Sequence, residues 1–285
     1  LRHLEHGLSV ADVAGLARLS ASGVRSELFN LSRWGFVDVF PKVDLRRQIP
    51  KPDSRVELSP TGRDCWELLA PLTEIVEARW RSRFGKDAFA KLCAGLSELV
   101  VQLDPRLPDF LPVVSSRHKH QPFCAELDPP FGSFATGPEL AVGALPLYAL
   151  VARVLQAFTW DFEQRSAVSL TALADFVRPL ADGAVAVSDL PQRAGVSEAA
   201  IMQGRAFLTK AALAVLEPVA DAKGKQLQLT EAGQQAWADG QNNLRSAEAH
   251  WDDRFGAARM RSLREVLEAF VVSRDLASSP LGQGL

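Results

Sequence analysis

VELSPTG at residues 56–62 and LQLTEAG at residues 227–233 are two versions of one pattern, separated by 171 positions. In both, alternating apolar residues are followed by a hydroxyl residue and, three positions later, by a glycine. Alternation predicts a half-buried strand. Ser or Thr directly after the strand predicts a helix N-cap, because its hydroxyl accepts from the free N–H groups of the first turn. The chain is therefore expected to run from strand straight into helix at two places.

The match between the two regions extends well beyond this stretch. RWRSRFG at 79–85 aligns with HWDDRFG at 250–256 at the same offset of 171. Upstream the offset is 177, because the first region carries six more residues between Val39 and Val56. Tryptophan, phenylalanine and glycine stay in register, which is the sign of an internal repeat. We therefore predict a tandem duplication.

The residues before the first predicted strand favour two short helices joined by a tight turn. Ser9 or Asp12 is expected to cap a helix that reaches Leu19, and Ser20 to cap the next helix. Apolar residues at 24, 28 and 31 form one stripe of that second helix, and its opposite face is polar. This arrangement is typical of a helix-turn-helix.

A β-hairpin with a basic tip is expected next. Gly35 ends the second helix, and residues 36–40 and 55–58 alternate like paired strands. The cations Lys42, Arg46, Arg47 and Lys51 lie between them, as in the wing of a winged helix. Ser59 is then expected to cap one long helix over 60–83, which Gly85 ends before a last helix that reaches residue 101.

The second half of the sequence predicts the same plan. Its helices are expected over residues 138–163, 168–181, 188–194, 197–210, 231–254 and 257–273, and its wing over 213–229. The first repeat has no counterpart of the helix over 138–163. We therefore expect that the first repeat lacks its first helix and that the native gene product carries about 40 further residues before Leu1.

These elements define the predicted fold class: mainly α with small β-hairpins, a duplicated winged helix-turn-helix in the order α-α-α-α-β-β-α-α. The expected domains are a first repeat over 1–103, a Pro/Gly-rich linker over 104–137 and a second repeat over 138–285. The last helix of each repeat has an apolar stripe that needs a partner, which predicts an intramolecular pseudo-dimer. The stripes are Leu92, Leu96, Leu99 and Val100 in one repeat, and Leu263, Val266, Leu267 and Phe270 in the other.

At this point the chain resembles the MarR-type winged-helix regulators. The resemblance rests on the helix-turn-helix capped by Ser20 or Ser197, on Gly35-Phe36-Val37 after the recognition helix, and on residues 56–62 and 227–233. It implies homodimers joined through first and last helices, a recognition helix in the major groove and a wing on the minor groove of double-stranded DNA. It also implies a transcriptional regulator, modulated by a small aromatic or acidic effector or by oxidants. Independently of the resemblance, three scattered cysteines are too few for a disulfide framework, which favours a cytoplasmic protein.

The polar face of each second helix and the two wings supply the residues expected to contact DNA. Arg25 and Ser26 are placed to reach base edges, because arginine can donate two hydrogen bonds to guanine. Arg46 and Arg47 are placed to reach phosphates. The full set is Ser20, Ser22, Arg25, Ser26, Asn30, Arg46, Arg47, Ser197, Met202, Gln203, Lys223 and Lys225.

The two repeats differ in charge. Residues 18–63 hold nine Lys/Arg and five Asp/Glu, whereas residues 190–233 hold five and four. Phosphate binding needs a local excess of cations. In addition, Arg205 takes the stripe position of Leu28, where an arginine is costly unless it is paired or at the edge of the core. The second repeat is therefore expected to be a weaker reader or purely a dimerisation partner.

Other functions find little support in the sequence. No phosphate loop, Gly-x-Ser-x-Gly or His-Glu-x-x-His motif occurs, so we expect neither an enzyme nor a catalytic residue. His118, His120 and Cys124 lack an obvious fourth ligand, so no metal or cofactor is expected. Cys65 and Cys93 are expected to be buried apolar residues rather than redox sensors. The net charge of −2 keeps one alternative open, a winged-helix protein-interaction module that does not bind DNA.

Two further expectations concern apolar groups. The longest apolar run, residues 141–152, is too short to span a bilayer and predicts a buried helix and no membrane partner. Trp80 and Trp251 occupy matching positions, where they either pack in the core or line an aromatic ligand crevice. The linker phenylalanines at 110, 123, 131 and 134 are alternative lining residues for such a crevice.

Overall fold

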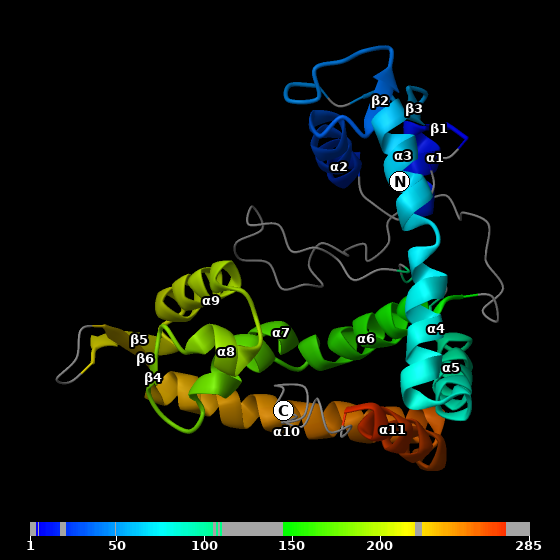
Figure 1. The fold of residues 1–285 in the computed structure, drawn as a ribbon. Coiled ribbons are helices and arrows are strands. Elements are labelled where there is room, and N and C mark those ends of the chain that lie inside the picture. Colours follow the sequence, from blue (N-terminus) through cyan, green and yellow to red (C-terminus); the bar gives the residue numbers. More distant parts are fainter. Residues whose placement is uncertain are drawn as a thin grey trace. The chain divides into compact units, whose positions relative to one another are not determined.

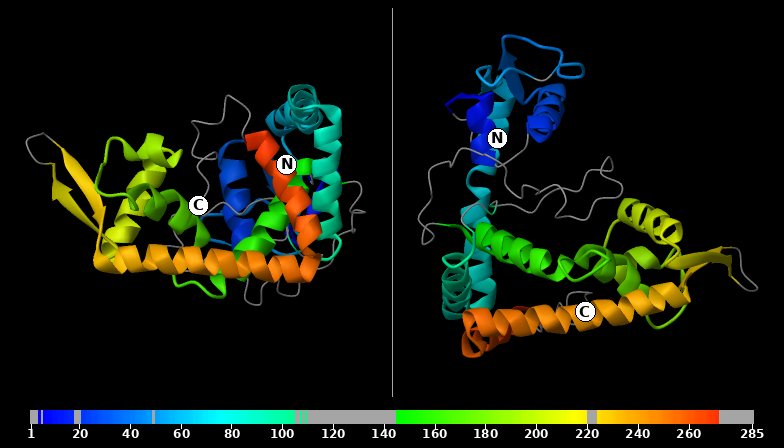
Figure 2. Two further views of the ribbon diagram at one scale, coloured as in Figure 1. Left: turned by 90° about the horizontal axis from the view of Figure 1, so that it is seen from below. Right: turned by 180° about the vertical axis from the view of Figure 1, so that it is seen from behind.

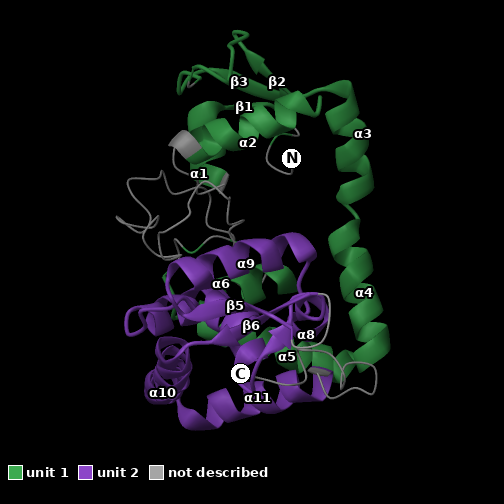
Figure 3. Cartoon of the chain, turned by 90° about the vertical axis from the view of Figure 1, so that its left-hand side faces the viewer, with its two compact units in different colours: residues 1–111, 127–154 green, residues 112–126, 155–285 purple. Residues whose placement is uncertain are grey.

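The computed structural model describes residues 4, 6–17, 21–48, 50–104, 107, 109, 145–219 and 224–271. Of these, residues up to 109 together with 145–154 form unit 1, and residues 155–271 form unit 2 (Figure 3). The boundary lies inside one helix, α6 (Leu147–Glu163), which the sequence analysis places entirely in the second repeat.

Unit 1 joins a helix-turn-helix to a small antiparallel sheet. Its elements are β1 (Leu8–Ser9), α1 (Val10–Ala17), α2 (Ala21–Arg33), β2 (Val37–Phe40), β3 (Arg55–Leu58), α3 (Pro60–Leu69), α4 (Leu72–Phe84) and α5 (Lys86–Val100) (Figure 1). The strand order is β1-β3-β2, with Val56 of β3 opposite Leu8 on one side and Val39 on the other. The predicted hairpin is confirmed, and β1 is an additional strand that the sequence analysis did not predict.

The core of unit 1 lies between α2 and the sheet. Val24 and Leu28 of the predicted stripe are buried against Val37 and Val56. Leu31 packs against this cluster from its edge. Each fully buried Val or Leu contributes about 1.5–3 kcal/mol. The face of α2 that carries the stripe is therefore fixed inward, and this sets the direction of its polar face.

The first half of α6 belongs to unit 1 and is largely buried. Its first N–H, that of Leu147, donates to Oε1 of Glu77 at 2.8 Å. Arg153 is also buried, and its Nε donates to Oδ1 of Asp109 at 2.7 Å. The prediction that the apolar run forms a buried helix is confirmed for residues 147–152; residues 138–144 lie outside the described part of the chain.

Unit 2 follows the same succession of elements. They are α7 (Leu170–Ala172), η3 (Leu173–Val177), η4 (Arg178–Leu180), β4 (Val185–Ala186), α8 (Leu190–Ala194), α9 (Glu198–Lys210), β5 (Ala214–Pro218), β6 (Lys225–Leu229), α10 (Glu231–Phe255) and α11 (Ala257–Val271). The sheet order is β4-β6-β5. Helix α10 runs from the β5–β6 hairpin at one end to α11 at the other (Figure 2). The shared succession agrees with the predicted repeat, while the duplication itself stays a prediction.

The strand-to-helix corner has the same construction in both units. The hydroxyl of Ser59 accepts from the N–H of Gly62 at 2.9 Å and donates to the carbonyl of Gly35. The hydroxyl of Thr230 accepts from the N–H of Gly233 at 3.1 Å and donates to the carbonyl of Ala212 at 2.7 Å. The two predicted N-caps are therefore confirmed.

The glycine at each corner is required by a close approach of two backbones. A Cβ at Gly62 would lie 1.9 Å from the carbonyl oxygen of Phe36, and one at Gly233 would lie 2.0 Å from that of Leu213. No side chain fits at such a distance. This explains in steric terms why both stretches carry glycine three residues after the capping hydroxyl.

Two predicted helices are wrong in detail. The single helix expected over 60–83 is divided into α3 and α4 at Pro71, which has no N–H to continue the helical hydrogen bonds. The helix expected over 168–181 is regular only over α7, then becomes a π-helix (η3) and ends as a 3₁₀-helix (η4). The fold class, mainly helical with small antiparallel sheets, is confirmed.

No helix in the described part of the chain is both long and apolar enough to cross a membrane.

Candidate nucleic-acid interface

Helix α2 presents the polar face that the sequence predicts for a recognition helix. Burial of Val24 and Leu28 leaves Ser26 exposed and Arg25 and Asn30 half-buried. Ser20 lies outside the described residues, and the side chain of Ser22 is not among those that the structure describes. Three of the five residues predicted on this helix are therefore placed, and all three have solvent access.

The ends of the helix-turn-helix are fixed by local hydrogen bonds. The N–H of Asp12 donates to the hydroxyl of Ser9 at 3.0 Å, so Ser9 is the cap of α1. Gly35 has φ +76° and lies directly after the last turn of α2. Phe36 N donates to the carbonyl of Leu31 at 2.9 Å, which is the closing bond of a Schellman motif. The predicted end of this helix at Gly35 is confirmed.

The loop that joins β2 to β3, residues 41–54, is folded against unit 1 instead of projecting as a free tip. Leu45 is only 8% exposed and belongs to the core cluster of α2 and the sheet. On the return to β3, the carbonyls of Pro52 and Ser54 accept from the first N–H groups of α1 at 2.9 and 2.8 Å. The predicted wing is therefore the strand pair β2–β3, and both halves of the long loop between these strands are held by contacts with the rest of unit 1.

The two arginines predicted to touch phosphate lie in the turn of this loop. The guanidinium carbon of Arg46 is 5.9 Å from the ring centroid of Phe29 on α2, within cation–π range. Asp44 accepts from the N–H of Arg46 at 3.0 Å, and its other oxygen lies 3.7 Å from Nε of Arg47. Both arginines remain exposed. The structure thus places Arg46 beside α2 and leaves Arg47 exposed to solvent.

The sequence analysis missed Phe29 and Leu45 as the residues that position this loop. A single leucine inside a charged loop, Asp44-Leu45-Arg46-Arg47, was the available signal, because a lone apolar residue in such a segment has reason to be buried. Lys42 and Lys51 are exposed on the same loop, so four cations share one connection.

The corresponding helix of unit 2, α9, carries a different surface. Ser197 caps it, accepting from Ala200 N at 3.3 Å. Met202 is 61% exposed, and Gln203 is also exposed. Lys225 is exposed at the start of β6, whereas Lys223 lies outside the described residues. The predicted residues of this helix are thus accessible but uncharged.

Arg205 is not buried at the stripe position that the repeat assigns to it. Gly204 takes the buried place, and Phe176 of η3 covers it so closely that a Cβ at Gly204 would lie 2.3 Å from the ring. Arg205 is half-buried beside it. The expected cost of an arginine in the core is avoided because the phenylalanine supplies the apolar volume.

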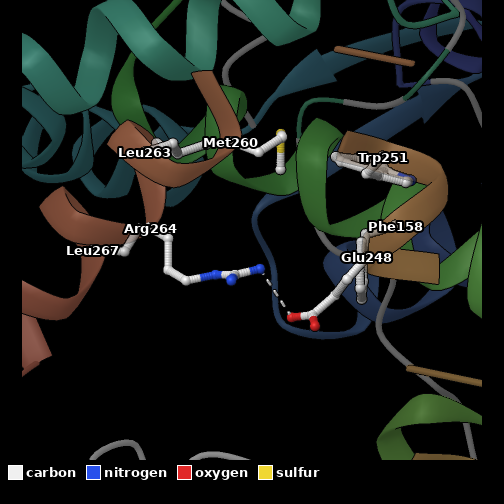
Figure 4. A pocket seen from close by; sticks show the side chains of 7 residues that line it. All are labelled: Phe158, Glu248, Trp251, Met260, Leu263, Arg264 and Leu267. Carbon is white, nitrogen blue, oxygen red and sulfur yellow. Dashed lines mark hydrogen bonds and ion pairs between the residues drawn. The ribbon is translucent and has the colours of Figure 1, made fainter. Parts of the chain in front are cut away.

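A small apolar cleft lies in unit 2 between α6, α10 and α11 (Figure 4). Its volume is about 160 Å³, and it is lined by Phe158, Glu248, Trp251, Met260, Leu263, Arg264 and Leu267. Arg264 and Glu248 form an ion pair at 3.3 Å on one side. Of the two interpretations of Trp251, core packing is confirmed by its 1% exposure, and the edge of its ring also borders this cleft.

Two groups in the described part of the chain have a shifted pKa. Burial, reinforced by the charge of Glu77, raises the pKa of the Cys93 thiol, which disfavours its thiolate form. Burial also raises the pKa of Asp175 in η3, against the opposing charge of Arg178. Among the described residues no three His, Cys, Asp or Glu side chains gather as metal ligands. His118, His120, Cys124 and the linker phenylalanines lie outside the described part.

Comparison with known proteins gives only distant structural likeness. No family model matches the sequence, and no curated protein matches it. A crystal structure of NadR in complex with 4-hydroxyphenylacetate aligns over 42% of this chain and 88% of that one, with 18% identity and a TM-score of 0.33. At this TM-score the likeness decides neither fold nor function.

Proposed function

We propose that this chain is a sequence-specific double-stranded DNA-binding protein that regulates transcription, and that unit 1 is its principal reader. One observation carries the proposal: the polar face of α2 and the four exposed cations of loop 41–54 belong to one small unit, with Arg46 held beside α2. A basic loop next to an exposed helix face is the electrostatic footprint of a DNA-binding unit.

The proposed mechanism assigns different tasks to the two sets of residues. Arg25, Ser26 and Asn30 of α2 reach base edges in the major groove and distinguish sequences. Arg46 and Arg47 neutralise phosphates and set the register of the protein on the duplex. Because Phe29 already holds Arg46, less side-chain entropy is lost when that contact forms. Binding at a promoter would occlude or recruit the transcription machinery.

A small aromatic or acidic effector is the proposed regulator, and the cleft of Figure 4 is its proposed site. The cleft volume of about 160 Å³ is sufficient for one aromatic ring, since an apolar cavity of about 150 Å³ binds benzene. Arg264 at its side offers a partner for a carboxylate. Titration with benzoate should change the fluorescence of Trp251 saturably and more weakly in Arg264→Ala. A linear response, unchanged by Trp251→Phe, would remove the cleft from the proposal.

The decisive experiment measures binding of the full chain to duplex DNA at several salt concentrations. Arg46→Ala with Arg47→Ala should weaken binding to all sequences alike and flatten the log–log salt slope by about 0.9 per lost phosphate contact. Arg25→Ala should cost about 1–3 kcal/mol on the preferred site and little elsewhere. Arg261→Ala, an exposed arginine on α11, is the matched control and should have no effect.

The protein-interaction module predicts a different result. Duplex DNA would then bind weakly, without sequence preference, and neither arginine variant would change the affinity. If Arg25→Ala and the loop variant lost equal affinity on all DNA sequences, α2 would contact phosphates and would not read bases.

A further inference from the structure

We propose that the two recognition helices read unlike half-sites, guanine-containing DNA for α2 and A·T-rich DNA for α9, so that the chain recognises a directional, non-palindromic operator. The inference rests on the proposed function, because it specifies the DNA that the regulator binds. It is argued from the side chains that each helix presents within its own unit.

The exposed face of α9 has a composition suited to A·T pairs. Ala199, Met202, Gln203 and Ala206 are all exposed and follow the i, i+3, i+4, i+7 spacing of one helical face. Glutamine pairs with adenine through N6 and N7, and apolar side chains contact the thymine methyl group. Exposed charged side chains occur on α9 only at its ends, at Glu198 and Lys210, and Arg205 between them is half-buried.

This apolar content is not needed to fold unit 2. The opposite face of α9 already fills the core with Ile201 and Leu208, and Phe176 closes the space over Gly204. Met202 points away from that core and is 61% exposed. Met202 lies between Ala199 and Ala206 on the exposed face and contributes little to the stability of unit 2. A contact with a partner outside the unit therefore explains this exposed apolar face better.

The matching positions on α2 suit a different base pair. Arg25 corresponds to Met202 and Ser26 to Gln203 at the repeat offset of 177. Arginine donates two hydrogen bonds to O6 and N7 of guanine, which an A·T pair does not accept in the same way. The repeat therefore places a guanine reader and a thymine-methyl contact at the same helix position of two units.

The charges of the two units agree with this division. Phosphate-neutralising cations concentrate on loop 41–54 of unit 1, so unit 1 supplies most of the affinity. Helix α9 then adds discrimination through contacts that carry no charge. Loss of an α9 contact should change which sequence is bound while it leaves the salt slope unchanged.

The first test is selection of bound sequences from random duplex DNA by the full chain. We expect two unlike elements in a fixed orientation, one containing guanine and one consisting of A·T pairs. A palindrome with guanine in both halves, or a single element, would overturn the inference while leaving the proposed function intact. Absence of enrichment together with salt-independent binding would instead overturn the proposed function.

The second test alters the selected duplex and the α9 side chains together. Gln203→Ala should weaken binding about 5- to 150-fold, the range of one bidentate base contact. Replacement of adenine by 7-deazaadenine in the A·T element should weaken binding of the wild-type chain by the same factor. It should not weaken binding of Gln203→Ala any further. Deoxyuridine for thymidine should weaken the wild-type chain and leave Met202→Ala unaffected.

The matched control is Gln234→Ala, an exposed glutamine on α10, which should leave binding unchanged. Equal sensitivity of wild type and Met202→Ala to deoxyuridine would overturn the assignment of Met202. An unchanged affinity of Gln203→Ala would overturn the assignment of Gln203.

Discussion

Helix α10 of unit 2 carries two tryptophans, and helices α3 and α4 of unit 1 together carry two, at positions that match in sequence. The first matching pair is buried to a similar degree in both units, and the second is not. Trp66 and Trp237 are both partly buried against the core of their own unit. Trp80, in contrast, is 39% exposed, whereas Trp251 is 1% exposed. The same residue in the same short motif therefore has two different environments.

The difference comes from α6. Phe158 packs edge-on against Trp251 with ring centroids 5.2 Å apart, and Asp161 accepts from its Nε1 at 2.7 Å. Trp80 packs against Phe84 of its own helix, with centroids 5.5 Å apart. A tryptophan is thus buried by what another element brings to it, and the motif around it does not decide its burial.

Removal of the two tryptophans should give the largest contrast. Trp251→Ala is expected to lower the free energy of unfolding by about 3–5 kcal/mol, since it empties a packed site. Trp80→Ala should cost about 1 kcal/mol or less, as is usual for a side chain with solvent access. Urea unfolding followed by circular dichroism measures both. Equal losses would mean that Trp80 has a buried environment comparable to that of Trp251.

A second contrast between the units lies nearer the start of α10, at Gly240. Gly240 admits Leu173, because a Cβ at Gly240 would lie 2.5 Å from that side chain, whereas the matching residue of unit 1 is the exposed Leu69. Gly240→Leu should destabilise unit 2 by about 1–3 kcal/mol through overpacking. Leu69→Gly should cost no more than about 1 kcal/mol, the difference in helix propensity. A stable Gly240→Leu variant would show that Leu173 has room to move aside.

The hydrogen bond to Trp251 gives a sharper measure of what α6 supplies. Asp161→Ala leaves the buried Nε1 without its acceptor and should cost about 1–3 kcal/mol. In the Trp251→Phe background the same substitution should cost less, because no N–H remains to be satisfied. A double-mutant cycle of unfolding free energies tests this. Additive losses would assign the role of Asp161 to another contact, such as that with His250, whose Nε2 lies 3.8 Å away.

The smallest expected effect is the pH dependence that Asp175 of unit 2 contributes to stability. Burial raises the pKa of Asp175 in the folded state, so the folded chain binds a proton more tightly than the unfolded chain. The contribution of this group to stability should therefore grow as the pH falls through its raised pKa and be lost as the pH rises. The unfolding free energy of wild type minus that of Asp175→Asn, measured against pH, should increase toward acid. A flat difference would contradict the prediction.

Local signals account for the parts of the fold that the sequence predicted correctly. The caps at Ser59 and Thr230, the end of α2 at Gly35 and the alternating strands each depend on a few neighbouring residues. The break between α3 and α4 was also readable, because Pro71 inside a helical pattern ends or kinks it. The π-helix of η3 was not predicted, and its residues Leu173 and Phe176 contact glycines of two other helices that are distant in sequence.

The candidate interface also has one part that local sequence predicts and one part that it does not. The outward direction of Arg25 and Ser26 followed from the apolar stripe of α2, which is periodic. The position of Arg46 beside Phe29 and the burial of Leu45 could not be predicted, because both depend on how a long loop returns to the core. The strand β1 was missed for a related reason: two residues are too few to show a period.

The hydroxyl of Ser59 has a mechanical consequence. It is bonded at once to the carbonyl of Gly35, just past the end of α2, and to the first turn of α3, so these two helices share a stiff pivot. Because residue 62 is a glycine, its backbone lies directly against that of Phe36, with no side chain between them. A tilt of α3 is therefore transmitted to α2 as a rotation about this point, with α3 acting as the lever arm.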